Sequence, residues 1–150
     1  AEKGYAPAQY NMGVLDEHGK GVPKNYKTAM KWYKLAANNG NALAQVSLGN
    51  KYYFGKGVKK NYKRAMGFYR LAAEQGNTLA QSKVGLLYAL GHGTKQDKFS
   101  AFIWWDIAAA QSQKDAVKNI KLLMKSMSPN EISKAQKLAQ QCVRQNFKGC

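Results

Sequence analysis

The stretch "GKGVKKNYKRAMGFYRLAAEQG", residues 55–76, decides the fold because nearly the same phrase, "GKGVPKNYKTAMKWYKLAANNG", stands at residues 19–40. A fixed period of about 36 residues is typical of repeat architectures. The register continues without a gap into a third, more divergent copy. The matched positions include Gly4, Gly40 and Gly76; Ala8, Ala44 and Ala80; Gly13, Gly49 and Gly85; and the aromatic pairs Trp32-Tyr33, Phe68-Tyr69 and Trp104-Trp105. We therefore interpret residues 4–39, 40–75 and 76–111 as three copies of one unit.

Each unit has the periodicity of two α-helices. In the first unit, one face of the first helix is predicted to pack in the core through Ala8, Gln9, Met12, Gly13 and Asp16. The second helix has its apolar residues at the i, i+3, i+4, i+7 spacing of a buried stripe. These residues are Tyr26, Ala29, Met30, Tyr33, Ala36 and Ala37.

Helix ends are also marked in every unit. Side chains that favour N-caps stand before the expected helices, and these are Asn25, Asn41, Asn61, Asn77 and Asp97. The Gly-x-Gly pairs 19/21, 55/57 and 91/93 fall between the two helices of a unit, where a turn needs positive φ. Each unit is thus predicted to be a helical hairpin, and tandem hairpins stack into an all-α, α/α superhelical solenoid.

The pattern closely resembles the Sel-one-like repeat family, which is related to the tetratricopeptide repeats. The resemblance rests on "AQYNMGVLDEHGKGVPKNYKTAMKWYKLAANNG", "AQVSLGNKYYFGKGVKKNYKRAMGFYRLAAEQG" and "AQSKVGLLYALGHGTKQDKFSAFIWWDIAAAQ", and it covers roughly residues 1–111. The third unit departs from the pattern at Thr94 and Lys98, where the other units have valine and tyrosine. The resemblance implies a right-handed superhelix whose first helices line the concave side and which holds protein partners.

Both ends of the sequence differ from a complete unit. "AEKG" at residues 1–4 matches the closing turns "ANNG" and "AEQG", so we expect the chain to begin inside an earlier hairpin of a longer array. Beyond Gln111 the period decays, because Lys121 stands where a glycine is expected. "SPNE", residues 128–131, is a capping box with proline at the first helical position. The helix that it opens, through about Asn146, makes residues 112–150 a predicted C-terminal helical cap.

Charge is the strongest compositional signal. The chain has 24 Lys and Arg against 8 Asp and Glu, a net charge of +16. Such a field favours acidic partners, which include nucleic acid, anionic glycan or lipid, and an acidic protein face. Lysines that only solvate the surface are the alternative. No stretch approaches the roughly 20 apolar residues of a membrane span.

Motifs for catalysis, cofactors and metals are absent from the sequence pattern. The glycine-lysine phrases lack the spacing and the hydroxyl residue of a phosphate-binding loop. His18 and His92 stand in different turns, with no nucleophile or metal ligand at a telling spacing. We therefore expect no enzyme activity, no small-molecule substrate, no cofactor and no metal site.

A basic stripe is predicted on the outer, convex face of the second helices. Its residues follow helical spacing and are Lys24, Lys27, Lys31, Lys34, Lys60, Lys63 and Arg70. A polyanion bound there would dissociate steeply with salt. A solvated outer face remains the alternative interpretation.

A partner-binding groove is predicted on the inner face of the first helices, which is largely apolar where a solvated helix should be polar. Its residues are Tyr10, Val14, His18, Leu43, Val46, Asn50, Phe54, Leu79, Ser82, Leu86 and Leu90. A peptide or helix could bury its side chains in such a groove. The alternative is that several of these residues pack against an adjacent hairpin.

The two cysteines, Cys142 and Cys150, lie close together in "CVRQNFKGC". A disulfide between them is favoured over two free thiols, and it predicts an oxidising compartment, the periplasm or exterior of a bacterium. The sequence as a whole predicts a non-enzymatic scaffold or adaptor for a protein or peptide partner, with an acidic partner suited to the charge. The alternatives are a binder of polyanions or of an envelope surface, and a structural segment of a longer array.

Overall fold

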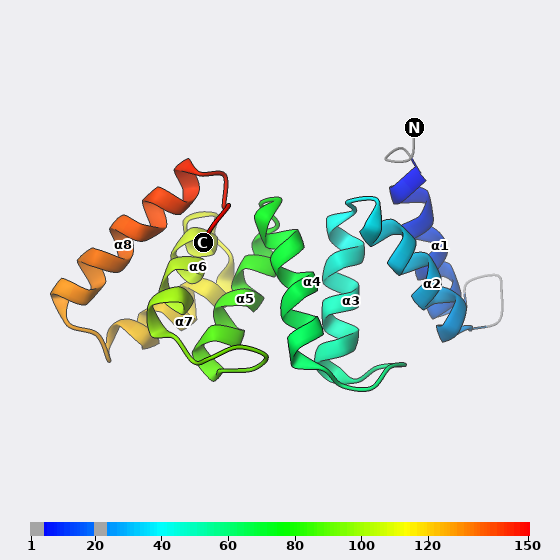
Figure 1. Cartoon of the computed structure of the whole chain (residues 1–150), viewed down its shortest axis with the longest axis horizontal. Coiled ribbons are helices and arrows are strands. Elements are labelled where there is room, and N and C mark those ends of the chain that lie inside the picture. Colours follow the sequence, from blue (N-terminus) through cyan, green and yellow to red (C-terminus); the bar gives the residue numbers. More distant parts are fainter. Residues whose placement is uncertain (1–4, 20–23) are drawn as a thin grey trace. The chain divides into compact units, whose positions relative to one another are not determined.

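The computed structural model describes residues 5–19 and 24–150, and these ranges contain eight α-helices and no strand (Figure 1). The all-α prediction is confirmed. The chain divides into two compact units, with the boundary between Phe68 and Tyr69 inside the fourth helix; unit 1 precedes this boundary and unit 2 follows it. The helices are α1 Ala6–His18, α2 Tyr26–Asn38, α3 Ala42–Phe54, α4 Tyr62–Glu74, α5 Thr78–Leu90, α6 Lys98–Ala110, α7 Lys114–Met124 and α8 Pro129–Arg144.

The 36-residue register extends further than the sequence suggested. First helices begin at residues 6, 42, 78 and 114, so α7 starts in register although the glycine expected at Lys121 is missing. Its N-cap is Gln113, whose side chain accepts from the N–H of Ala116 at 2.7 Å. The register is lost only at α8, which begins at Pro129 after the Ser128 cap. A helix start therefore depends on its cap more than on the glycine inside the helix.

The predicted helix ends are confirmed within the described residues. Asn25, Asn41, Asn61, Asn77 and Asp97 each accept from a main-chain N–H in the first turn of the helix that follows. Both hydrogen bonds of the capping box at Ser128 are present. Left-handed glycines close the first helices, with φ of 66° at Gly19, 71° at Gly55 and 70° at Gly91. Gly21 and the "AEKG" turn lie outside the described residues.

Unit 1 has a core between α1, α2 and α3. Tyr33 of α2 is almost completely buried, and a Cβ on Gly13 of α1 would stand 2.8 Å from its ring. The glycine is thus required for the two helices to approach. The predicted core face of α1 is wrong in part, because Ala8 and Met12 are exposed. Their repeat equivalents in α3 are fully buried, since that face of α3 packs on α2. Tyr26 of the predicted α2 stripe is also exposed, and it is the first residue of that helix.

Unit 2 has a core between α5, α6, α7 and α8. Its buried members include Phe102 and Trp105 of α6, Ile120 of α7 and Ala135 of α8. Gly85 of α5 repeats the role of Gly13, because a Cβ there would stand 2.6 Å from the Trp105 ring. Full burial of side chains of this size stabilises the unit by about 1.5–3 kcal/mol each.

Buried glutamines join consecutive hairpins. The Gln45 side chain donates through Nε2 to the carbonyl of Ala37 at 3.2 Å, and Gln81 donates in the same way to Ala73 at 3.3 Å. Both glutamines are buried, so each bond satisfies a buried side-chain amide, and it adds to the main-chain bond that the same carbonyl accepts from the N–H of Gly40 or Gly76. The Ala-Gln phrases at residues 44–45 and 80–81 therefore link consecutive hairpins.

Candidate partner-binding surface

The predicted groove residues occupy repeat positions with three different environments. The outer positions are exposed, and they are held by His18, Leu43, Phe54, Leu79 and Leu90. The middle positions are half-buried and are held by Tyr10, Val14, Asn50 and Leu86. Val46 and Ser82 are buried, with 7% and 5% of their surface exposed, so a partner cannot reach them in this structure.

The burial of these two residues has a structural reason. Buried residues lie on more than one face of α3 and of α5. A residue opposite the predicted core face of either helix can therefore still be buried. At Ser82 the main-chain carbonyl also accepts from the Trp105 indole N–H at 3.1 Å, which draws this turn of α5 into the unit 2 core. The available groove is therefore smaller than the sequence pattern suggested. Tyr10 and Val14 pack at the edge of the unit 1 core, and Leu86 packs on the unit 2 core.

In unit 1 the structure gathers three predicted groove residues around one hollow of about 260 Å³. His18 ends α1, and Asn50 and Phe54 stand on the last turns of α3. Leu43, at the start of α3, leaves 53% of its surface exposed, and Phe54 leaves 56%. The remaining lining is polar and consists of Glu17, Ser47, Lys51 and Lys56. This part of unit 1 thus combines exposed apolar side chains with groups that donate hydrogen bonds.

A partly buried ion pair between Lys51 and Glu17 lines this hollow. Lys51 Nζ donates to Glu17 Oε1 at 2.5 Å, and the Tyr33 hydroxyl donates to Glu17 Oε2 at 2.6 Å. Lys51 has only 5% of its surface exposed, and its ammonium lies 5.4 Å from the centre of the Tyr33 ring. One residue from each of α1, α2 and α3 is therefore held in a single polar cluster.

The carboxyl and hydroxyl groups of this cluster titrate abnormally. Burial raises the pKa of Glu17, but the hydrogen bonds from Lys51 and Tyr33 and the charge of Lys51 outweigh it, so the pKa lies below the ordinary 4.5. Burial and the neighbouring Glu17 carboxylate raise the pKa of the Tyr33 hydroxyl. At neutral pH, Glu17 is charged and Tyr33 remains a hydrogen-bond donor.

Sequence reasoning missed this cluster although a signal was present. Lys51 stands at a repeat position that holds Leu15 in the first unit and Leu87 in the third. A lysine in place of leucine on a helix that is otherwise apolar requires a buried partner, because an unpaired buried charge is costly.

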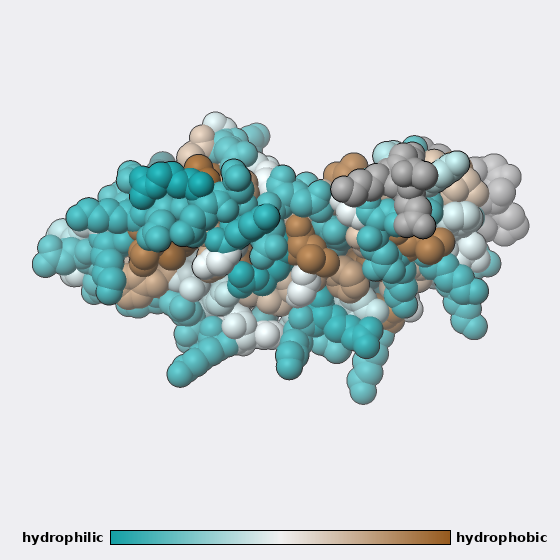
Figure 2. Space-filling model, turned by 45° about the horizontal axis from the view of Figure 1, so that its top comes forward, coloured by the Kyte–Doolittle hydropathy of each residue, from teal (hydrophilic) through white to brown (hydrophobic). Residues whose placement is uncertain are grey.

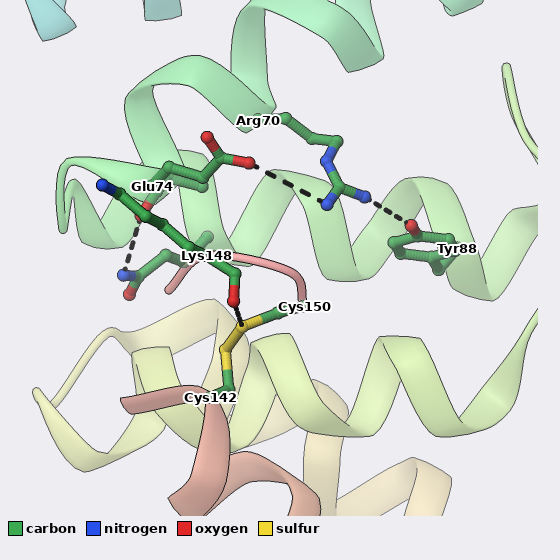
Figure 3. Close-up of a disulfide and its surroundings, with 8 residues drawn as sticks. Arg70, Glu74, Tyr88, Cys142, Lys148 and Cys150 are labelled. Atoms are coloured by element: carbon green, nitrogen blue, oxygen red, sulfur yellow. Dashed lines mark hydrogen bonds and ion pairs between the residues drawn. A yellow bond between two sulfur atoms is a disulfide. The ribbon is translucent and has the colours of Figure 1, made fainter. Parts of the chain in front are cut away.

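The predicted basic stripe is partly available. Lys24, Lys27, Lys31 and Lys34 are all exposed, as are Lys60 and Lys63. Arg70 differs, because it is half-buried in unit 2, donates to the Tyr88 hydroxyl at 2.7 Å and lies 4.0 Å from Glu74 (Figure 3). Its guanidinium is therefore engaged within the protein. Figure 2 shows long hydrophilic side chains on the visible face, with apolar side chains exposed between them.

A disulfide joins Cys142 of α8 to Cys150, with 5.7 Å between the Cα atoms (Figure 3). Cys142 is buried. The segment that the bridge closes turns back on α8, with positive φ at Asn146, Phe147 and Gly149. The N–H of Phe147 donates to the carbonyl of Cys142 at 2.9 Å.

Residues 5–19 and 24–150 also bear on metal binding and on membrane insertion. These ranges contain no group of three or more His, Cys, Asp or Glu side chains that could hold a metal ion. Among the same residues, no helix has the length and apolar character needed to cross a membrane.

Comparison with known proteins identifies the repeat. The Sel1 repeat model matches residues 6–41, 42–77 and 78–113. A Sel1 repeat protein from Oxalobacter formigenes has a similar structure, with a TM-score of 0.73 and 31% identity over 80% of this chain and 94% of that one. The structure of a protective antigen from uropathogenic Escherichia coli with an SLR fold aligns with 97% of this chain and 40% of its own, at 27% identity and a TM-score of 0.65. Cysteine-rich protein B of Helicobacter pylori shares the fold, with a TM-score of 0.63 and 18% identity over 78% of this chain and 92% of its own.

Curated relatives are similar over about one repeat. A sel1-like repeat-containing protein of Acanthamoeba polyphaga mimivirus is 53% identical over 34 residues, 23% of this chain, and the chitin synthase regulator SKT5 of Saccharomyces cerevisiae is 46% identical over 39 residues, 26% of this chain. Each match spans only 6% of the relative's length. Proteins built from this repeat generally use it as a scaffold for protein–protein interaction and are typically not enzymes.

Proposed function

The chain belongs to the Sel1 repeat family, and from this premise we propose that it is a non-enzymatic adaptor that binds a protein partner on the first helices of its repeats. One observation carries the proposal. Phe54 at the end of α3 is more than half exposed and lines a hollow together with His18, Asn50 and Lys51, and Leu43 at the start of the same helix is also more than half exposed. A partner would gain free energy by burying the two apolar side chains, and the polar lining would fix its orientation.

The chemistry of the surface favours an acidic or polar partner segment. Lys56 lies at the rim of the hollow, and the chain as a whole has a net charge of +16. A positive field accelerates the approach of an acidic partner more than it strengthens the final complex. Added salt should therefore slow association and leave most of the affinity in place.

The test is a capture experiment with extract from the source organism. The immobilised protein is washed in salt steps, and the bound material is analysed for protein, nucleic acid and glycan. We expect a defined protein that survives high salt. Phe54→Asp should remove it, because a carboxylate at this position cannot be buried in the complex.

A matched control is available on another helix. Leu35 of α2 is an exposed leucine outside the proposed surface, so Leu35→Asp should retain the partner. Leu86 is a poorer target because it packs on the unit 2 core. A loss of capture by a Leu86 variant could result from lower stability instead of a lost contact with the partner. Loss of capture by Leu35→Asp, or retention by Phe54→Asp, would contradict the proposal.

The competing function is polyanion or envelope-surface binding by the exposed α2 lysines. Reversal of charge at Lys27 and Lys31 should leave the protein partner bound under our proposal, and remove captured nucleic acid or glycan under the alternative. Polyanions would elute at moderate salt because their binding releases counterions. Capture of polyanion alone would transfer the function to the lysines.

We propose that the protein works in an oxidising compartment, the periplasm or exterior of a bacterium. The Cys142–Cys150 bridge supports this, because structural disulfides are rare in the cytosol. Alkylation of freshly extracted native protein should modify neither thiol before reduction and both after it. Two alkylated thiols without reduction would contradict the proposal.

A further inference from the structure

Unit 2 contains an apolar pocket that is separate from the proposed partner surface. It lies between α6 and α8, beside the disulfide-closed segment, and has a volume of about 370 Å³. Pockets of roughly 300–1,000 Å³ with few polar groups are typical of ligand and side-chain binding sites. The apolar lining includes Ile107 of α6, Ala139 and Val143 of α8, and Phe147.

One carboxylate lines this pocket, on Asp106 of α6. Asp106 is half-buried, and burial raises the pKa of its carboxyl above the ordinary value. Within the described part of the chain it takes part in no hydrogen bond or ion pair. The repeat register makes the residue unusual, because the equivalent positions hold Lys34 and Arg70. The charge is therefore reversed in the third repeat.

The other acidic residues of unit 2 have structural roles that Asp106 lacks. Glu74 lies beside Arg70, and Asp97 and Glu131 belong to helix caps. Asp115 stands in the first turn of α7, where the helix dipole favours a negative charge. Asp106 is in the middle of α6, away from both helix ends, and its carboxyl is partly buried.

The wall opposite α6 is held by covalent structure. Phe147 adopts φ of 64°, its N–H is bonded to the carbonyl of Cys142, and the bridge to Cys150 closes the segment that contains it. Its ring also approaches the α4–α5 turn, since a Cβ on Gly76 would lie 3.5 Å from Phe147 Cε2. The bridge and this main-chain bond thus restrain the backbone that carries Phe147.

We propose that this pocket binds a lysine side chain of a partner protein, with the aliphatic stem between Val143 and Phe147 and the ammonium at Asp106. A lysine matches both features, because its four-carbon stem packs on apolar surface while its head keeps a charged contact. The positive net charge of the protein does not prevent this, since exposed charges beyond about 8 Å are screened at physiological salt. The lysine is expected to stand in a partner segment that is otherwise acidic or uncharged. This inference concerns a different surface from the proposed adaptor face and does not depend on it.

The test uses the full chain, labelled with ¹⁵N, and follows amide shifts during titration with Nα-acetyl-lysine amide. The matched probe is Nα-acetyl-norleucine amide, which keeps the stem and lacks the charge. We expect shifts at Asp106, Ile107, Val143 and Phe147, with the lysine compound bound about fivefold more tightly, as for a partly exposed ion pair. Equal or tighter binding of norleucine would overturn the assignment.

Two variants and one further probe complete the test. Asp106→Asn should abolish the preference for lysine and keep the weak apolar binding, whereas Asp115→Asn, an exposed acid on α7, should leave the preference unchanged. If Asp106→Asn kept the full preference, the carboxylate would not be the site. n-Pentylammonium tests whether the pocket prefers a free amine to a lysine side chain of a protein. Tighter binding of n-pentylammonium than of the lysine compound would overturn the assignment to a partner protein.

Discussion

Three repeat positions are polar in unit 1 and apolar in unit 2. The two sets, 72 residues apart, are Glu17, Tyr33 and Lys51 in unit 1 and Ala89, Trp105 and Leu123 in unit 2. The set in unit 1 has one residue in each of α1, α2 and α3, and the set in unit 2 has one residue in each of α5, α6 and α7. In both, an aromatic ring lies against a glycine of the first helix. The packing of a Sel1 hairpin therefore depends on a large ring in the second helix facing a glycine in the first helix. The polarity of the neighbouring residues can change without altering this packing.

The largest effect on stability is expected when the space that Gly85 leaves for the Trp105 ring in unit 2 is filled. Gly85→Ala places a methyl group 2.6 Å from the buried Trp105 ring, whose N–H is bonded to Ser82. We expect a loss of about 2–3 kcal/mol in the free energy of unfolding, since overpacked cores relax incompletely. Urea unfolding followed by tryptophan fluorescence measures it.

Two further glycines sharpen this result. Gly13→Ala should also destabilise, because the Tyr33 ring lies 2.8 Å away and is tethered to Glu17. Gly67→Ala, within α4 and with no atom within 4 Å of the new Cβ, should stabilise by about 1 kcal/mol through helix propensity. If all three variants changed stability alike, close approach would not explain the repeat glycines.

The second effect concerns the disulfide, which is found in unit 2 alone. Cys142→Ala together with Cys150→Ala should lower the free energy of unfolding by about 2 kcal/mol, as expected for a short closed loop. Calorimetry of the oxidised protein, the reduced protein and this variant gives the comparison. The reduced protein and the variant should agree, and a variant as stable as the oxidised protein would show that the bridge does not stabilise unit 2.

The third effect tests the ion pair of unit 1. Lys51→Met should destabilise by about 1 kcal/mol, less than for a fully buried pair because Glu17 remains partly exposed. Conversion of the whole set, by Glu17→Ala, Tyr33→Trp and Lys51→Leu, should be neutral within about 1 kcal/mol or stabilising, since apolar groups often replace buried pairs without loss. If the triple variant had a much lower free energy of unfolding than the unmodified protein, the polar and apolar sets would not be interchangeable.

The smallest effect is a difference in pH dependence between the units. The folded pKa of Glu17 is below its unfolded value, so its contribution is present above pH 4.5 and is lost as pH falls through the folded pKa. The folded pKa of Asp106 is raised above 3.8. Its ionisation therefore lowers the free energy of unfolding as pH rises from the unfolded pKa through the folded pKa. Both changes should be below about 1 kcal/mol, because both groups are partly exposed.

Urea unfolding of Lys51→Met and of Asp106→Asn between pH 3 and 6 separates these contributions. The first variant should lose stability mainly above pH 4.5, and the second should gain it there. Parallel curves for the two variants would contradict the opposite signs assigned to the two carboxyl groups.

The fold was predictable from the sequence because its signals are local. Glycines, caps and alanines repeat at fixed spacing, and each acts on its own turn or helix contact. The start of α7 was missed because its cap is a glutamine, Gln113, which is a less common N-cap than the asparagines of the other units. The exposure of Ala8 was missed because the face it shares with Ala44 and Ala80 is buried only where another helix covers it.

The candidate surfaces were less predictable because they depend on which residues of several helices meet. Val46 and Phe54 both lie on the apolar inner face by helical spacing, yet one is buried and the other is exposed. The pairing of Lys51 with Glu17 joins positions 34 residues apart, which helical periodicity does not relate. The Asp106 pocket requires α8 and the turned-back segment beyond it, and no repeat pattern describes these.

The glutamine joint has a consequence for how such arrays change length. Gln45 at the start of one repeat is bonded to Ala37 at the end of the preceding one, and Gln81 is bonded to Ala73. The second and third repeats thus carry the donor for the junction before them, and the first and second repeats carry the acceptor for the junction after them. Duplication or deletion of the second repeat as a whole 36-residue unit would leave each of these junctions with both halves, whereas an insertion between an acceptor alanine and its glutamine, which are eight residues apart, would separate them. The array can therefore lengthen or shorten over evolution by unequal recombination without any compensating substitution.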